Sequence, residues 1–347
     1  MDKKTHSPRV TLEEYGIPNV SEFSNLQFTK WSLENFRKNL KINIVRQSDD
    51  KRELEFDLIG CTAALANSFR RILLSEVPSM AIDKVYMLNN TSLIQDEVLA
   101  HRLGLLPLRA DPKLFEFPAT TETSSAEEEE VSDQDTLRYE LKIICTRNPN
   151  APKDSRLNSD MYRNSEVYSS DIKWVPIGRQ ADMYPDGEKQ FGMLEPDILI
   201  AKLIPGHEIH AYMHAVKGIG KDHAKFSPVA TACYRLMPVI QLRKPITGQD
   251  AELLKTCFSP GVIELVKNKK KGEVEARVKD ARYDSCSRNV FRHDVFKNSV
   301  RLERIPDHFI FNIESIGAMP PGYLFLEAVK VLKGKCRTFL EELDSIH

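Results

Sequence analysis

Four histidines crowd into 17 residues and are the first candidates for a metal site: His207, His210, His214 and His223. On a helix, His210 and His214 would share a face and could chelate one ion. However, apolar residues occupy positions 209, 211, 213 and 215, which is the period of a strand. Four residues of a strand span about 13 Å, so the two rings could not reach the same ion. The pattern therefore favours the polar face of a sheet, and we expect no zinc site.

The segment "KGIGKDHAKF" contains a second candidate, a phosphate-binding loop. Gly218, Gly220 and Lys221 resemble part of a phosphate cradle, but the spacing G-x-x-x-x-G-K-[ST] is absent. A lone G-x-G-K is weak evidence for nucleotide binding. The pattern favours a tight loop with projecting cations.

Two cysteine segments are the candidates for an iron–sulfur cluster. Cys257 in "LLKTCFSPGVIEL" and Cys286 in "ARYDSCSRNVF" resemble the cysteine-plus-proline segments of bacterial-type ferredoxins. Such clusters need runs of closely spaced thiolates, and each segment here has one. Because two thiolates cannot hold a cubane cluster, we expect no cofactor.

Nucleophilic catalysis has little support in the sequence. There is no G-x-S-x-G motif, and no cysteine lies beside an obvious base. The adjacent carboxylates Glu341 and Glu342 are typical of the polar face of a helix. A triad is defined by spatial geometry and not by sequence spacing. No residue is nevertheless predicted to be catalytic, and the chain is not expected to be an enzyme.

The charge balance of the 347-residue chain bears on its partners. Lys and Arg total 49 and Asp and Glu total 50, for a formal net charge of −1. Free-standing nucleic-acid-binding proteins usually carry a basic excess, so any basic surface here must be local. Direct nucleic-acid binding remains the alternative function, through loop lysines and through a cluster at the tip of a predicted hairpin: Lys267, Lys269, Lys270 and Lys271.

The sequence shows no targeting or membrane segment. The N-terminal "MDKKTHSPRV" has no apolar run behind its lysines, so we expect no secretory signal. No stretch approaches ~18 consecutive apolar residues, so we expect no membrane span. The six cysteines are dispersed without a C-x-x-C pair, which favours a reducing, intracellular compartment.

The elements that carry these residues follow from periodicity. "LKINIVRQ" and "ELEFDLIG" alternate apolar and polar residues as strands with one buried face do. A helix then begins after Gly60 with Thr62 as its N-cap, and Pro78 ends it because the residue before proline avoids helical angles. Its apolar side chains recur on one face: Leu65, Phe69, Ile72 and Leu73.

The rest of the chain is predicted to be mixed. From Ile82 onward we expect short strands, a helix at "DEVLAHRLGLLP" and a mobile acidic loop over residues 121–135. Two strands with a turn at Pro205-Gly206 should follow in "DILIAKLIPGHEIHAYMHAVKGIG", and a hairpin in "GVIELVKNKKKGEVEARV". A last helix is predicted from about Gly322, with an apolar stripe of about six turns. Such a stripe is longer than one small domain needs to cover its own core. Its members are Phe325, Val329, Leu332, Cys336, Phe339 and Leu343.

Three long blocks give the chain a family resemblance. "LANSFRRILLSEVPSMAIDKVYMLNNTSLIQDEVLAHRLGLLPL" resembles the signature of the alpha-like subunits of DNA-dependent RNA polymerases, the family of bacterial alpha and archaeal D. "KGIGKDHAKFSPVA" and "FIFNIESIGAMPP" resemble the two other blocks of that family, in the same order. The resemblance covers residues 40–343.

Within the family, the chain resembles the larger alpha-like subunit shared by eukaryotic RNA polymerases I and III. The polymerase II paralogue carries a zinc-binding cysteine cluster soon after "HRLGLLPL", where this chain has its acidic loop and only Cys145 further on. The resemblance implies a non-catalytic assembly and scaffold subunit for rRNA, tRNA and 5S rRNA transcription. It also implies a location in the nucleus, including the nucleolus.

The resemblance implies an α+β fold. It consists of an RNA polymerase alpha N-terminal-like dimerisation domain with an inserted mainly-β domain and a degenerate ferredoxin-like insertion. The implied boundaries are an N-terminal arm at 1–29, a dimerisation domain at 30–82, 226–240 and 305–347, an insert domain at 83–225, and the ferredoxin-like insertion at 241–304.

The resemblance also implies two partner surfaces. The first and last helices would pack on a smaller alpha-like subunit in a heterodimer, through Leu65, Phe69, Ile72, Leu73, Phe325, Val329, Leu332, Cys336, Phe339 and Leu343. A second set would dock on the second-largest polymerase subunit: Asn67, Arg70, Arg71, Lys217, Gly218, Gly220, Lys221 and His223. A solvated face is the alternative for this set. Small zinc-binding common subunits would join later, with no membrane contact and only indirect contact with nucleic acid.

Overall fold

The computed structural model describes residues 9–21, 31–118, 131–152, 158–267 and 273–345. The chain divides into two compact units. The first unit comprises Met1–Gln47, Glu55–Ser68 and Cys233–Asn312, and the second comprises Ser48–Leu54, Phe69–Ala232 and Ile313–His347. None of the helices in the described ranges is both long and apolar enough to cross a bilayer.

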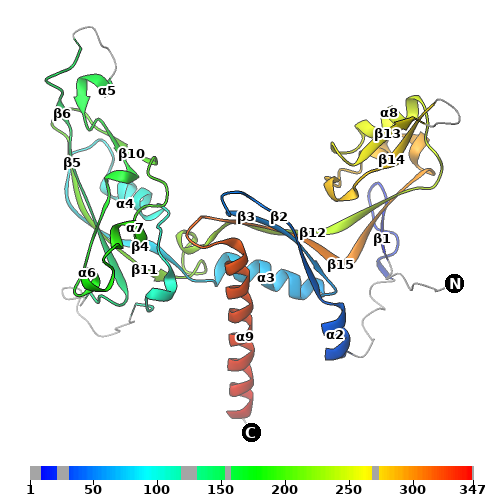
Figure 1. Cartoon of the computed structure of the whole chain (residues 1–347), viewed down its shortest axis with the longest axis horizontal. Helices are drawn as coiled ribbons and strands as arrows, with labels where there is room; N and C mark the ends of the chain where they lie inside the picture. The colour runs from blue at the N-terminus through cyan, green and yellow to red at the C-terminus, as the bar shows by residue number, and fades with distance from the viewer. Residues whose placement is uncertain (1–8, 22–30, 119–130, 153–157, 268–272, 346–347) are drawn as a thin grey trace. The chain divides into compact units, whose positions relative to one another are not determined.

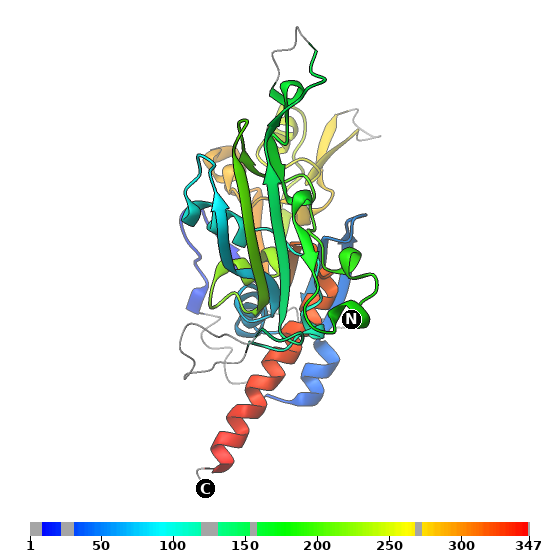
Figure 2. The ribbon, with the colours of Figure 1, turned by 90° about the vertical axis from the view of Figure 1, so that its left-hand side faces the viewer.

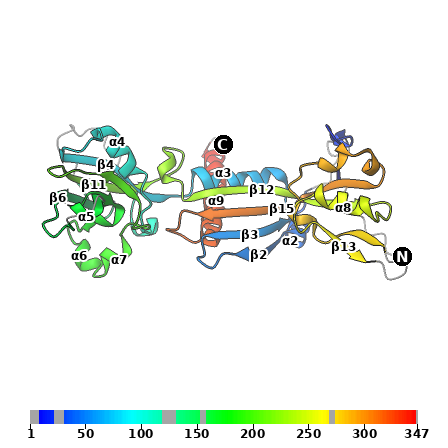
Figure 3. The same cartoon turned by 90° about the horizontal axis from the view of Figure 1, so that it is seen from above.

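A five-stranded sheet organises the first unit. Its strands run in the order β1 (Val10–Leu12), β15 (Val300–Ser315), β3 (Glu53–Ile59) and β2 (Lys41–Gln47), and β12 (Val229–Leu242) also pairs with β15. Figure 3 shows β12, β15, β3 and β2 side by side. The two alternating segments predicted to be strands are β2 and β3. The expected buried face is confirmed for β3 but was wrong for β2, whose residues are all exposed because it lies at the edge of the sheet.

The segment between β12 and β15 has a small core of its own. It contains helix α8 (Gln249–Thr256) and an antiparallel hairpin of β13 (Ile263–Lys267) and β14 (Val274–Val278). The hairpin was predicted; residues 268–272, which hold three of the tip lysines, lie outside the described residues. The apolar members pack together with β1: Leu12, Leu254, Val262, Val290 and Phe296.

A four-stranded antiparallel sheet organises the second unit (Figure 2). Its order is β4 (Ser79–Asn90), β11 (Glu208–Gly218), β5 (Thr136–Ile144) and β9 (Lys173–Val175). The prediction of short strands from Ile82 was wrong for β4, because pairing with β11 extends it over 12 residues. Helix α4 (Asp96–Gly104) was predicted correctly.

The smaller elements of this unit connect the sheet strands. β10 (Leu199–Lys202) and β11 flank the predicted turn, where Gly206 has a φ of +94°, but β10 pairs with β8 (Glu166–Tyr168) and not with β11. The remaining elements are β6 (Thr146–Arg147), β7 (Tyr162–Arg163), α5 (Asn158–Met161), α6 (Gln180–Met183) and α7 (Gly187–Gln190).

Two longer helices carry the predicted apolar stripes. Helix α3 (Ala63–Ser75) begins as expected, since the Thr62 hydroxyl accepts a hydrogen bond from the Leu65 amide at 3.3 Å. Helix α9 (Pro321–Ser345) is the longest of the described helices. The boundary between the two units falls within α3, β3, β12 and β15. The domain boundaries implied by the family resemblance stay a prediction.

A charged cluster ties the segment after the hairpin to the sheet of the first unit. Arg282 is only 8% exposed; it donates to Glu55 at 2.5 Å and also to Asp57. His308 Nε2 lies 3.2 Å from the other carboxylate oxygen of Asp57. These contacts join residues more than 200 positions apart, so the cluster fixes long-range topology.

Replacing Arg282 with methionine should strongly destabilise the first unit. The carboxylates of Asp57 and Glu55 would lose their shared cation, and breaking a buried ion pair costs about 3–5 kcal/mol. Chemical unfolding of the full chain measures the loss. The control is Arg277→Met on β14, because the Arg277 side chain is 59% exposed and its pair with Glu275 should contribute no more than ~1 kcal/mol. Equal effects of the two substitutions would contradict the structural role of Arg282.

Candidate partner-binding surfaces

The apolar stripe of α9 divides into a covered half and an open half. Leu324, Phe325 and Ala328 in the first turns are buried within the chain. Large apolar side chains stay exposed on another face of these turns and along the C-terminal turns, among them Leu326 at 61%, Phe339 at 62% and Leu340 at 59%. Figures 1 and 2 both show the C-terminal turns of α9 extending away from the β-sheet of the same unit. The open half of α9 therefore exposes large apolar side chains of types that proteins mostly bury.

The buried half of α9 packs against α3. The rings of Phe69 and Phe325 lie 5.1 Å apart between centroids, in a tilted arrangement. The side chain of Lys335 holds both carboxylate oxygens of Glu76, just beyond α3, at 2.8 Å. An aromatic contact and an ion pair therefore set the direction in which the open half of α9 projects.

Four of the predicted partner contacts need correction. Phe69, Ile72, Leu73 and Phe325 are each less than 9% exposed within this chain, so they are core residues and not open contacts. The apolar stripe of α3 is covered because the chain's own elements pack on it. Leu65 and Leu332 are partly exposed, and the open members of the predicted set are Val329, Cys336, Phe339 and Leu343.

Two exposed leucines were absent from the predicted set. Leu326 is 61% exposed and Leu340 is 59% exposed. The available sequence signal is spacing: Leu340 follows Cys336 by four residues and Leu326 precedes Val329 by three, so both widen the apolar face.

The predicted G-x-G-K loop packs directly on the C-terminal end of α3. A Cβ atom on Gly220 would lie 2.3 Å from the Leu74 carbonyl oxygen, and one on Gly218 would lie 2.7 Å from the Phe226 ring. The Lys221 amide donates to the Ser75 carbonyl at 2.8 Å. Close backbone approach therefore explains both glycines, and no bound phosphate is needed to explain them.

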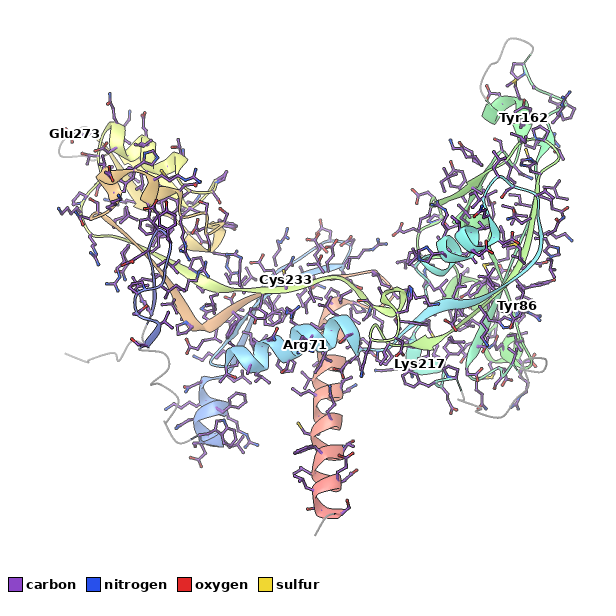
Figure 4. All side chains as sticks on the ribbon, turned by 180° about the vertical axis from the view of Figure 1, so that it is seen from behind. Arg71, Tyr86, Tyr162, Lys217, Cys233 and Glu273 are labelled. Atoms are coloured by element: carbon purple, nitrogen blue, oxygen red, sulfur yellow. The ribbon has the colours of Figure 1, made fainter. Side chains whose placement is uncertain are left out.

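The predicted large-subunit docking residues differ in their exposure. Arg71 is exposed on α3 (Figure 4). Asn67 and Arg70 are partly buried. Lys221 and His223 are exposed on the loop. The structure thus brings the loop next to the last turn of the helix that carries Arg71.

Lys217 is held by its own chain. Its ammonium donates to the Phe115 carbonyl at 3.0 Å and lies 4.8 Å from the centre of the Phe117 ring. Burial lowers its pKa below the ordinary lysine range. This lysine therefore positions β11 and is a weaker docking candidate than Lys221.

A family model for the RNA polymerase Rpb3/Rpb11 dimerisation domain matches residues 55–336. The chain belongs to this family. The matched range contains the whole of α3 and the first part of α9.

Several curated relatives resemble the chain over nearly all of its length. DNA-directed RNA polymerases I and III subunit RPAC1 of Mus musculus is 51% identical, over 97% of this chain and 96% of the relative. The protein of the same name from Saccharomyces cerevisiae is 47% identical over 90% of each. DNA-directed RNA polymerase II subunit rpb3 of Dictyostelium discoideum is 31% identical over 81% of this chain and 87% of the relative.

His210 and His214 lie on strand β11, as the alternation predicted, whereas His207 and His223 lie outside this strand. His210 Nε2 lies 3.1 Å from Glu140 Oε1 on β5, and the His214 ring packs 4.8 Å from Tyr86 on β4. In the part of the chain that the structure describes, no three His, Cys, Asp or Glu side chains group as metal ligands would.

The two cysteines in the ferredoxin-like segments, Cys257 and Cys286, differ in burial. Cys257 is buried in the small core of the insertion, and burial raises the pKa of its thiol. Cys286 is partly exposed on a backbone with a φ of +61°. All six cysteines are free thiols.

Replacing Gly220 with alanine should displace the loop from α3. The new Cβ would clash with the Leu74 carbonyl oxygen, and overpacking of this kind costs about 1–3 kcal/mol. Thermal unfolding measures the cost, and hydrogen exchange at the Lys221 amide reports the lost bond to Ser75. Gly334→Ala in α9 is the control, because nothing lies within 4 Å of the added atom and alanine is the better helix former by ~1 kcal/mol. Unchanged protection of the Lys221 amide in Gly220→Ala would contradict the close approach.

Proposed function

We propose that this chain is the larger alpha-like subunit shared by RNA polymerases I and III, and that it acts as a non-catalytic assembly platform. The relatives named as the I and III subunit are 38–51% identical, whereas the polymerase II relative from Dictyostelium discoideum is 31% identical. The observation that carries the assembly role is the exposed apolar half of α9. In this role the protein works in the nucleus, including the nucleolus.

The open half of α9 takes a smaller alpha-like subunit as its partner. Large exposed side chains form this surface: Leu326, Val329, Phe339, Leu340 and Leu343. Full burial of one such side chain stabilises by about 1.5–3 kcal/mol. Five of them offset a substantial part of the ~4–15 kcal/mol that association costs. A second apolar helix from the partner would supply the remaining contact area.

The end of α3 and the adjacent loop form a separate docking surface for the second-largest subunit. Arg71, Lys221 and His223 are its exposed polar groups. An arginine fork suits a desolvated interface because it can satisfy a carboxylate with two hydrogen bonds. Small zinc-binding common subunits then join the assembly.

Replacing Phe339 with aspartate should abolish pairing with the smaller subunit while the chain itself still folds. The substitution puts a carboxylate on the open surface, where an interface would bury it unpaired. Co-expression followed by co-purification of the two subunits measures pairing. Thr338→Asp is the matched control, because residue 338 lies on the opposite face of the helix from the apolar stripe.

A second variant separates pairing from folding. Ile72→Asp should unfold the chain, because Ile72 is 3% exposed in its core. Normal pairing by Phe339→Asp, or equal losses in Phe339→Asp and Thr338→Asp, would contradict the assignment of α9.

Charge reversal at Arg71 should spare pairing and weaken the later step. Arg71 is exposed on α3 and does not belong to the apolar stripe of α9. Binding of the purified heterodimer to the second-largest subunit, with wild type and Arg71→Glu compared, measures this step. Retained binding in Arg71→Glu would remove this residue from the docking surface.

A further inference from the structure

A cavity of about 800 Å³ lies within the first unit, beside β1 and β15. Residues from the N-terminal segment, from the end of β12 and from the start of β15 line it. The charged members of its lining are Arg9, Glu13, Arg243, Lys297, Arg301 and Glu303. Four cations against two carboxylates leave a net charge of +2.

Of the two acids in the lining, Glu303 is buried and paired with cations in the described contacts. Its side chain is 5% exposed, and its carboxylate lies 3.1 Å from Arg9 Nη1 and 2.8 Å from Arg301 Nε. Gln241 Nε2 donates to the same carboxylate at 3.1 Å. Arg301 also donates to the Thr11 hydroxyl at 2.9 Å. These contacts hold one wall of the cavity rigid and fix two guanidinium groups on it.

Two cations on the rim are not neutralised in this way. Arg243 is exposed, and its one described hydrogen bond comes from its backbone amide to the Ser299 carbonyl. Lys297 pairs with Asp294 at 2.7 Å, but that carboxylate is 89% exposed and therefore strongly screened. The side chains of Arg243 and Lys297 can therefore reorient toward an anion in the cavity without breaking a strong ion pair.

The surrounding sequence strengthens the positive potential. The described residues within 241–304 contain 12 Lys or Arg and 9 Asp or Glu, a net of +3, although the whole chain carries −1. A concave site within such a region concentrates anions. Leu12, Phe291 and Val300 supply an apolar part of the lining, as ligand pockets usually have.

We propose that this cavity binds a small organic polyphosphate. Arginine forks bind phosphate oxygens bidentately, lysine adds a point charge, and the volume matches the ~300–1,000 Å³ of small-molecule sites. Nucleoside polyphosphates and inositol polyphosphates share this chemistry. A pocket of about 800 Å³ with the buried Glu303 cluster on one wall suits a compact ligand better than a nucleic-acid strand, which needs an extended groove.

Titration calorimetry on the full chain in complex with its smaller partner tests the site. The probes are ATP, inorganic tripolyphosphate and inositol hexakisphosphate, and a single-stranded oligonucleotide serves as a fourth. We expect saturable binding of at least one of the three small probes. Preference for ATP over tripolyphosphate would identify a nucleotide ligand held partly by the apolar lining, and preference for inositol hexakisphosphate would identify the other source.

Variants then locate the binding. Arg243→Ala combined with Lys297→Ala should weaken binding of the preferred probe by at least about tenfold, because both side chains donate charge-assisted hydrogen bonds to phosphate oxygens. Arg243→Lys with Lys297 intact should retain most of the affinity. Lys279→Ala is the control, because Lys279 is exposed in the same unit but does not line the cavity. Circular dichroism checks that each variant is folded.

Three outcomes would overturn the proposal. The first is a lack of saturable binding by every small probe. The second is an equal loss in Lys279→Ala and in the double variant, which would indicate unspecific attraction to the basic region. The third is tighter binding of the oligonucleotide than of any small probe, with the same dependence on Arg243, which would assign the surface to nucleic acid.

Discussion

The packing of α3 against the first turns of α9 is the constraint on which the partner surfaces depend. The rings of Phe69 and Phe325 pack against each other in the core, and Lys335 forms an ion pair with Glu76 just beyond α3. These contacts bury most of the apolar stripe of α3. The apolar side chains on the C-terminal turns of α9 have no such cover within the described residues and stay exposed. A helix of this composition is stable in water when a second apolar surface covers it.

The same helix pair also sets the place of the polar loop. Gly220 lies against the Leu74 carbonyl, and the Lys221 amide satisfies the Ser75 carbonyl, an acceptor that the helix end leaves open. Lys113 fixes the start of α9 from the other side, through Glu327 at 3.1 Å and the Tyr323 ring at 4.1 Å. The apolar surface of α9 and the polar loop at Gly220 are therefore both positioned by the packing of α3 against α9, although they consist of different residues.

In the first unit, buried ion pairs hold distant segments of the chain together, as apolar packing does around α3. Arg282 connects its segment to Asp57 and Glu55 on β3, and Glu303 gathers Arg9, Arg301 and Gln241 around one carboxylate. Each cluster joins segments that are far apart in the chain. Such clusters specify which segments meet, because an unmatched partner would leave a buried charge unpaired.

The sequence by itself determined which residues form the elements and which faces are apolar. The Thr62 cap, the alternation in β2, β3 and β11, and the stripes on α3 and α9 all follow from local spacing. Only the tertiary structure decided that Ile72 and Leu73 are covered while Phe339 and Leu340 are open, and that Lys217 is held by Phe115. Periodicity records that a face is apolar, but burial depends on contacts between residues far apart in sequence, which local spacing does not encode.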